Sequence, residues 1–181
     1  MNQFTRAATL LVAIGLFPIT SSLADNSVGN LHLVISVITG EHSLDSNSTT
    51  TSFTLSDHTL IYERSYHGAH SGRRPSLKKE YKLTHDDETR IMAFMSDKNL
   101  WENKTISKPP QEKGTSFYFE ITIRGELDHK QSLISIDGSR SDTHLREDAN
   151  YKDAVSLVDQ LCDIIRRTDP EVVCPQLIDV K

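Results

Sequence analysis

Residues 117–124 constrain the fold more than any other segment of this chain. Their side chains alternate between apolar and polar in the order FYFEITIR. Because successive side chains of a β-strand point to opposite faces, the segment predicts a strand with one wholly apolar face. Such a face has to be buried, so the chain needs a second layer of structure to cover it.

The region from Asp148 to Pro170 can supply that layer. Its apolar side chains recur at intervals of three and four: Tyr151, Ala154, Val155, Val158, Leu161, Cys162 and Ile165. This spacing predicts a helix with one apolar stripe, beginning near Asp148 or Asn150 and ending before Pro170. An earlier helix is predicted from Thr84 to about Asn99, because Thr84 with Asp87 resembles a capping box and acidic residues fill the first turn.

The remaining apolar segments predict strands. They lie at residues 31–39, 51–56, 59–66 and 77–83, and a return strand at 131–136 follows a turn at 125–128. Residues 57–58 are expected to turn a hairpin, and the polar run 42–50 is expected to be a loop. The order is strands, helix, hairpin, helix. We therefore expect an α+β domain, a mostly antiparallel sheet with two helices packed on one face.

The first 24 residues have the order of a secretory signal peptide: an arginine, an apolar run, and small residues at a cleavage site after Ala24. The apolar run is shorter than the roughly 20 residues that span a bilayer, which favours cleavage over an uncleaved anchor. We expect a signal peptide at 1–24, a flexible segment at 25–30, one domain at 31–168 and a C-terminal tail at 169–181. The protein is then exported, to the periplasm or the extracellular space, with no membrane span after cleavage.

Cys162 and Cys174 are the two cysteines of the chain. In an oxidising compartment such a pair is most simply a disulfide, which would tie the tail to the last turns of the final helix. Two free thiols are the alternative. A redox-active pair is disfavoured because no C-x-x-C spacing is present.

The segment YHGAHSGRRP, residues 66–75, concentrates histidine, glycine and arginine. Its composition favours a solvated connection between strands. A second interpretation is a loop that binds an anion or a protein partner through His67, His70, Arg73 and Arg74. A third is a metal site built from His42, His67 and His70 with Glu41, although the spacing does not identify a complete ligand set.

The hairpin register suggests neighbours for this loop. If strands 51–56 and 60–66 pair around residues 57–58, His67 lies roughly opposite Thr49. The connection that carries Glu41 and His42 would then sit at the same end of the sheet.

The other polar cluster, residues 137–148, includes acids, serines and His144. It is typical of a strand-to-helix loop followed by an acidic helix start, although His144 could serve as a general acid or a metal ligand. No nucleophile elbow, zinc-protease motif or phosphate loop occurs, and no cofactor is expected. The formal charge of −5 disfavours nucleic acid. Asn47 and Asn103 match the glycosylation pattern, which matters only in a eukaryotic secretory pathway.

Four segments together resemble small exported bacterial proteins of unassigned function, and faintly the emfourin-type inhibitors of secreted metalloproteases. They are YKLTHDDETRIMAFM, LW, SFYFEITI and YKDAVSLVDQLCDII. The resemblance implies an inhibitor-like role and carries over no inhibitory residue. We therefore expect a non-enzymatic binding or inhibitor-like module with a protein partner or an anionic ligand. The alternative is a small metal-dependent or hydrolytic enzyme that uses His67, His70 or His144.

Overall fold

The computed structural model describes residues 31–41, 47–68, 75–106, 117–128, 130–139 and 143–177. The predicted signal peptide 1–24, the segment 25–30 and the last residues of the predicted tail, 178–181, lie outside the described residues. Within the described part, no helix combines the length and the apolar character needed to span a membrane.

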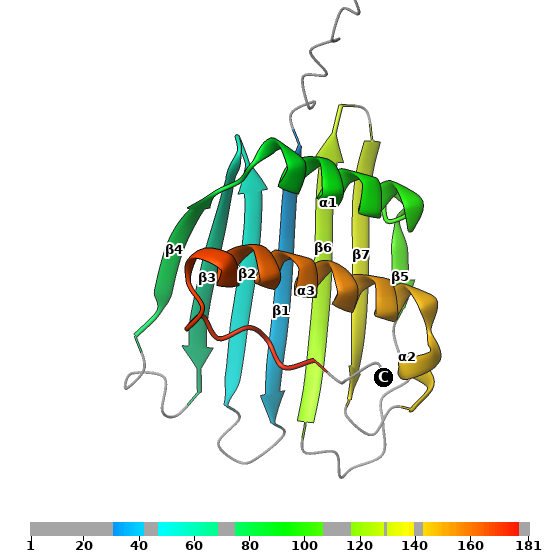
Figure 1. The fold of residues 1–181 in the computed structure, drawn as a ribbon. Coiled ribbons are helices and arrows are strands. Elements are labelled where there is room, and N and C mark those ends of the chain that lie inside the picture. The colour runs from blue at the N-terminus through cyan, green and yellow to red at the C-terminus, as the bar shows by residue number, and fades with distance from the viewer. Residues whose placement is uncertain are drawn as a thin grey trace, which may run out of the picture.

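Among the described residues, seven strands form one sheet in the spatial order β4-β3-β2-β1-β6-β7-β5. The strands are β1 (His32–Glu41), β2 (Ser48–Ser56), β3 (Thr59–His67), β4 (Leu77–Lys82), β5 (Lys104–Ile106), β6 (Phe117–Leu127) and β7 (Lys130–Ser139). Neighbouring strands run antiparallel, except that β5 runs parallel to β7. Helices α1 (His85–Asp97) and α3 (Ala149–Thr168) both cross one face of this sheet (Figure 1). The predicted α+β fold is confirmed.

Both long helices begin at the caps that their sequences provide. At α1, Thr84 accepts a hydrogen bond from the Asp87 N–H at 3.2 Å, and Asp87 accepts one from the Thr84 N–H at 3.3 Å, so the predicted capping box is present. At α3, the Asp148 carboxylate accepts from the N–H groups of Asn150 and Tyr151. These bonds satisfy backbone donors that the helices themselves leave unpaired.

Within the described ranges, two ion pairs join the antiparallel helices near their ends. Arg167 of α3 bonds Asp87 at the start of α1, and Lys98 at the end of α1 pairs with Asp153 of α3 at 3.2 Å. Burial by itself would raise the pKa of Asp87, but hydrogen bonds from Arg167 and Thr84 outweigh it and hold that pKa below its ordinary value.

The core lies between the sheet and the helices. The inward positions of β6 and the stripe of α3 are buried, as the alternation at 117–124 and the spacing at 148–168 predict: Phe119, Ile121, Ile123, Tyr151, Ala154, Val155, Val158, Leu161, Cys162 and Ile165. The Phe119 and Tyr151 rings meet across the two layers with centroids 5.3 Å apart. Burial of these side chains is the main stabilising contribution.

The register of the first hairpin differs by one residue from the register predicted from the sequence. Ser56 pairs with Thr59 around a two-residue turn in which Asp57 and His58 have φ of 49° and 60°. This is the geometry whose twist matches that of a hairpin. His67 is consequently opposite Ser48, whereas the sequence placed it opposite Thr49. The predicted loop 42–50 is also too long, because β2 begins at Ser48.

The predicted turn at 125–128 is wrong. β6 continues through Gly125 to Leu127, and β7 returns from Lys130 to Ser139. Gly125 lies in the strand because helix-side groups pack closely on it: a Cβ there would be 3.0 Å from the Trp101 ring and 3.3 Å from the Met95 methyl carbon. A glycine that a bulky neighbour requires within a strand has the same sequence signature as a turn glycine.

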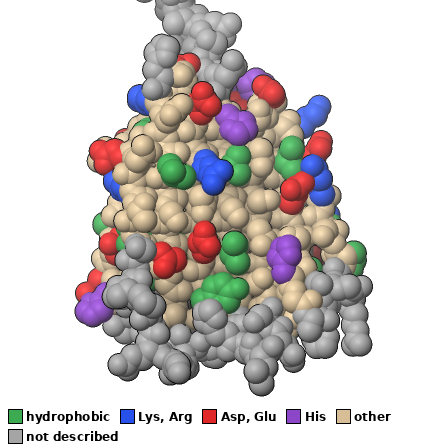
Figure 2. All heavy atoms as spheres, turned by 180° about the vertical axis from the view of Figure 1, so that it is seen from behind, with side chains coloured by type: hydrophobic (Ala, Val, Ile, Leu, Met, Phe, Trp, Pro, Cys, Tyr) green, Lys and Arg blue, Asp and Glu red, His purple; other side chains and the backbone are tan. Residues whose placement is uncertain are grey.

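The opposite face of the sheet carries no helix among the described residues. Its central strands carry a group of short hydroxyl side chains: Ser36, Thr50, Ser52, Thr54, Thr122 and Ser135. Four of these hydroxyls form one row across adjacent strands, because Ser52 pairs with Ser36, Ser36 with Thr122, and Thr122 with Ser135. Figure 2 shows this open face, on which separate basic and acidic groups lie among uncharged surface.

Candidate functional site: the loop end of the sheet

One end of the sheet is formed by the last residues of β1, β3, β5 and β7, and we call it the loop end. The connections 42–46, 69–74, 107–116 and 140–142 leave from it and lie outside the described residues (Figure 1). Strand register brings His67, Ser48, Gly40 and Tyr118 into one row there. The predicted neighbourhood of His67 and the β1 terminus is therefore correct at the level of the sheet end.

The opposite end of the sheet is fastened to α1. His58, in the β2–β3 turn, bonds the buried carboxylate of Glu88 at 2.8 Å, and its carbonyl accepts from the Leu83 N–H at 2.9 Å. The polar groups at this end are hydrogen-bonded to each other, as is typical of contacts that stabilise the fold.

The structure describes only some of the histidines that the sequence predicted as site residues. His67 is exposed, and its Nε2 lies 3.2 Å from the Ser65 hydroxyl. His42, His70, Arg73 and Arg74 lie outside the described residues.

His144 is exposed on α2 (Thr143–Glu147), which lies beside β7 and β5 on the helix side, far along the sheet from β3 (Figure 1). The structure does not bring His144 and His67 together. Among the residues that the structure describes, no three His, Cys, Asp or Glu side chains are grouped so that they could hold a metal ion.

Arg64 occupies an inward position of β3, between Tyr62 and Tyr66. Its Nη1 donates to the Val173 carbonyl at 3.2 Å, and its guanidinium carbon lies 5.2 Å from the centre of the Tyr66 ring. Its Nε is buried and has no hydrogen-bond partner within the described ranges. No carboxylate of those residues pairs with Arg64 either. A half-buried cation without a counter-ion is energetically costly, so it points to an acceptor from elsewhere.

The C-terminal tail holds the carbonyl that orients Arg64. After α3 the chain turns back and crosses the helix-side face of the sheet toward β6 (Figure 1). The predicted disulfide between Cys162 and Cys174 is present, and Val172 beside it is buried. Tyr62 donates its hydroxyl to the same Val173 carbonyl at 2.7 Å. The tail is therefore fixed to both the final helix and β3.

Two exposed apolar side chains flank this guanidinium. Leu77 lies directly opposite Arg64 in the β3–β4 register and is 38% exposed, while Val173 is 54% exposed. Leu133, on the open face, is the other large hydrophobic side chain exposed among the described residues. We call Arg64, Tyr66, Leu77 and Val173 the Arg64 corner. A partly desolvated arginine with an aromatic ring and an apolar rim is the composition typical of an interface hot spot.

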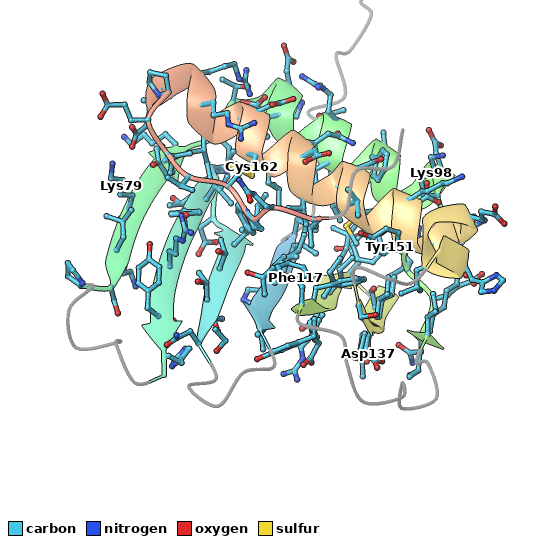
Figure 3. All side chains as sticks on the ribbon, turned by 90° about the horizontal axis from the view of Figure 1, so that it is seen from below. Lys79, Lys98, Phe117, Asp137, Tyr151 and Cys162 are labelled. Carbon is cyan, nitrogen blue, oxygen red and sulfur yellow. A yellow bond between two sulfur atoms is a disulfide. The ribbon has the colours of Figure 1, made fainter. Side chains whose placement is uncertain are left out.

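The adjacent polar groups of β4 are already paired. Lys79 bonds Asp169, and the Tyr81 hydroxyl donates to the same carboxylate at 3.1 Å. The Lys79 hydrogen bond is the main cause of a lowered Asp169 pKa, and burial, helped by Asp169, raises the pKa of Tyr81 to about 12. Figure 3 views the sheet from the loop end and shows Lys79 on its edge strand, on the side of Cys162 and α3. Arg64 is thus the cation of this corner that lacks a carboxylate counter-ion among the described residues.

Arg64 is not among the binding residues predicted from the sequence. The sequence does contain a pattern that could have identified Arg64. One face of the strand carries Leu60, Tyr62, Arg64 and Tyr66, so a charged side chain interrupts a series of apolar and aromatic positions. No sequence pattern predicts the contact between Val173 and Arg64, because that contact depends on the path of the tail.

No protein-family model matches this chain, and no curated protein matches its sequence. The resemblance to emfourin-type inhibitors therefore stays a prediction.

Proposed function

We propose that this protein is an exported binding module that acts without catalysis, as an inhibitor-like partner of another protein. The exported location is supported by the signal-peptide pattern at 1–24 and is compatible with the disulfide. The observation that carries the binding role is the Arg64 corner, where two exposed apolar side chains surround an arginine without a counter-ion among the described residues.

The partner that fits this corner is a polypeptide with an acidic surface. Residues 64–82 contain six basic side chains and one acidic side chain: Arg64, Arg73, Arg74, Lys78, Lys79 and Lys82, against Glu80. Lys78 and Lys79 pair with Glu63 and Asp169, and the other basic side chains leave a local excess of positive charge that attracts an acidic partner, although the whole chain is acidic. The predicted binding residues His67, His70, Arg73 and Arg74 belong to this same segment and extend the proposed surface.

Leu77 and Leu133 allow a matched test of the binding surface. Both are exposed leucines on strands, one in the Arg64 corner and the other on the open face. The purified protein, Leu77→Asp and Leu133→Asp serve as bait for the exported fraction of the source cells, and bound proteins are quantified by mass spectrometry. We expect one partner that the unchanged protein and Leu133→Asp retain and that Leu77→Asp loses at least tenfold. Identical recovery with all three baits, or equal loss with both variants, would reject the corner as the binding surface.

The enzymatic alternative has its own test. Zinc content measured on the purified protein should be far below one ion per chain. If the protein holds one zinc ion per chain and His67→Ala loses it, the proposal of a binding module is rejected in favour of a metal-dependent enzyme.

A further inference from the structure

The Arg64 guanidinium has one edge in use and one edge open. Its Nη1 bonds the Val173 carbonyl. The other edge is made by Nε–H and an Nη2–H, and we call it open because its Nε, although buried, has no hydrogen-bond acceptor within the described ranges. The Tyr66 ring lies beside the guanidinium and restricts its rotation. These contacts present the edge in a fixed direction, which lowers the entropic cost of binding.

We propose that this open edge binds a carboxylate of the polypeptide partner, an inference that rests on the proposed function. A carboxylate has two oxygens with the spacing of this pair of N–H donors, and the resulting charge-assisted bonds are among the strongest in proteins. A phosphate group has more oxygens and more charge to satisfy, and a single guanidinium with apolar neighbours suits it less well.

Access to the edge requires a neighbouring side chain to move. Nε is covered in the structure, and Leu77 is the residue directly opposite Arg64 on β4. Because the Leu77 side chain is 38% exposed and lies at the first position of its strand, it can change rotamer at little cost. Displaced, it joins Val173 as the apolar rim around the bound carboxylate.

Acetate is the probe for the test. The ¹⁵N-labelled protein is titrated with sodium acetate at constant ionic strength, and the arginine Nε–H signals are followed by NMR. We expect the Arg64 signal to move downfield and to saturate in the millimolar range. Acetamide, a neutral molecule of the same shape, should leave it unchanged, and phosphate should bind more weakly than acetate.

Arg124 provides the matched control. It is exposed on the open face, and no ion pair or hydrogen bond holds its side chain among the described residues. Arg64→Gln should abolish the saturable response, and Arg124→Gln should preserve it. Arg64→Lys keeps the charge but lacks the paired donors, so it should weaken acetate at least fivefold even if Arg64→Gln fails to fold.

Three results would overturn the carboxylate site. They are the absence of a saturable shift at Arg64, an equal response at every arginine, and binding of phosphate as tight as that of acetate. An edge already occupied by a carboxylate of this chain would give the first result. Failure of this inference can be distinguished from failure of the proposed function. If Leu77→Asp loses the partner but acetate does not affect partner binding, the protein is a binding module whose Arg64 edge does not bind a carboxylate.

Discussion

The disulfide that fixes the C-terminal tail gives a quantitative stability prediction. Cys162 and Cys174 are 12 residues apart in sequence. On the chain-entropy model, closing a loop of this length in the unfolded chain stabilises the fold by about 3 kcal/mol. Replacing both cysteines with alanine should therefore lower the free energy of unfolding by about that amount. For a chain of this size the loss corresponds to a fall in Tm of roughly 6–12 °C.

The measurement is urea unfolding of the oxidised protein and of the double alanine variant, followed by circular dichroism. The slope m should rise in the variant, because its unfolded chain is no longer cross-linked and exposes more surface. A single Cys162→Ala variant should be about as unstable as the double variant, since either change removes the bond. A loss of less than about 1 kcal/mol would refute the reasoning, and would mean that the tail contacts alone hold the chain.

Three further predictions concern other contacts. Because the pKa of Asp87 is lowered in the folded state from an ordinary value of 3.8, its contribution to stability is present above that value and is lost as pH falls through the folded pKa; Asp87→Asn should reduce the acid sensitivity of the urea midpoint. Gly138→Ala places a Cβ 2.1 Å from the Leu145 methyl carbon and should cost about 1–3 kcal/mol, and adding Leu145→Ala should give a less than additive loss in thermal unfolding. Because the pKa of Tyr81 is raised to about 12, its stabilising contribution is complete below pH 10.0 and is lost as pH rises through about 12; Tyr81→Phe should remove one late-titrating phenol from the ultraviolet absorbance.

The fold could be predicted to the extent that local patterns determine it. The alternation in 117–124, the stripe in 148–168 and the Thr84 cap are properties of consecutive residues, so the sequence displays them directly. β5 could not be predicted, because three residues form a strand only when β7 offers them an edge. The five-residue helix α2 has the same difficulty, since so short a helix depends on its surroundings.

The sequence predicted at which end of the sheet the candidate site lies, but not which residues form it. Counting strands places the 66–75 connection and the β1 terminus at one sheet end, which the register supports. The Arg64 corner also needs Val173 and Leu77, which are distant in sequence and meet only through the path of the tail and the β3–β4 pairing. A sequence pattern records which residues face inward, but not which carbonyl a returning chain places beside them.

The position of β1 has a consequence for how the polypeptide matures. β1 is an apolar strand in the middle of the sheet, fourth of the seven strands in the described order. Its two neighbours are β2, which follows it at once, and β6, which comes much later in the chain. Pairing with β6 waits until most of the polypeptide has emerged from the ribosome, and such late, long-range pairing is slow. Until then one flank of an apolar strand remains open. A nascent chain of this topology has a long interval in which a chaperone can engage it before its core closes.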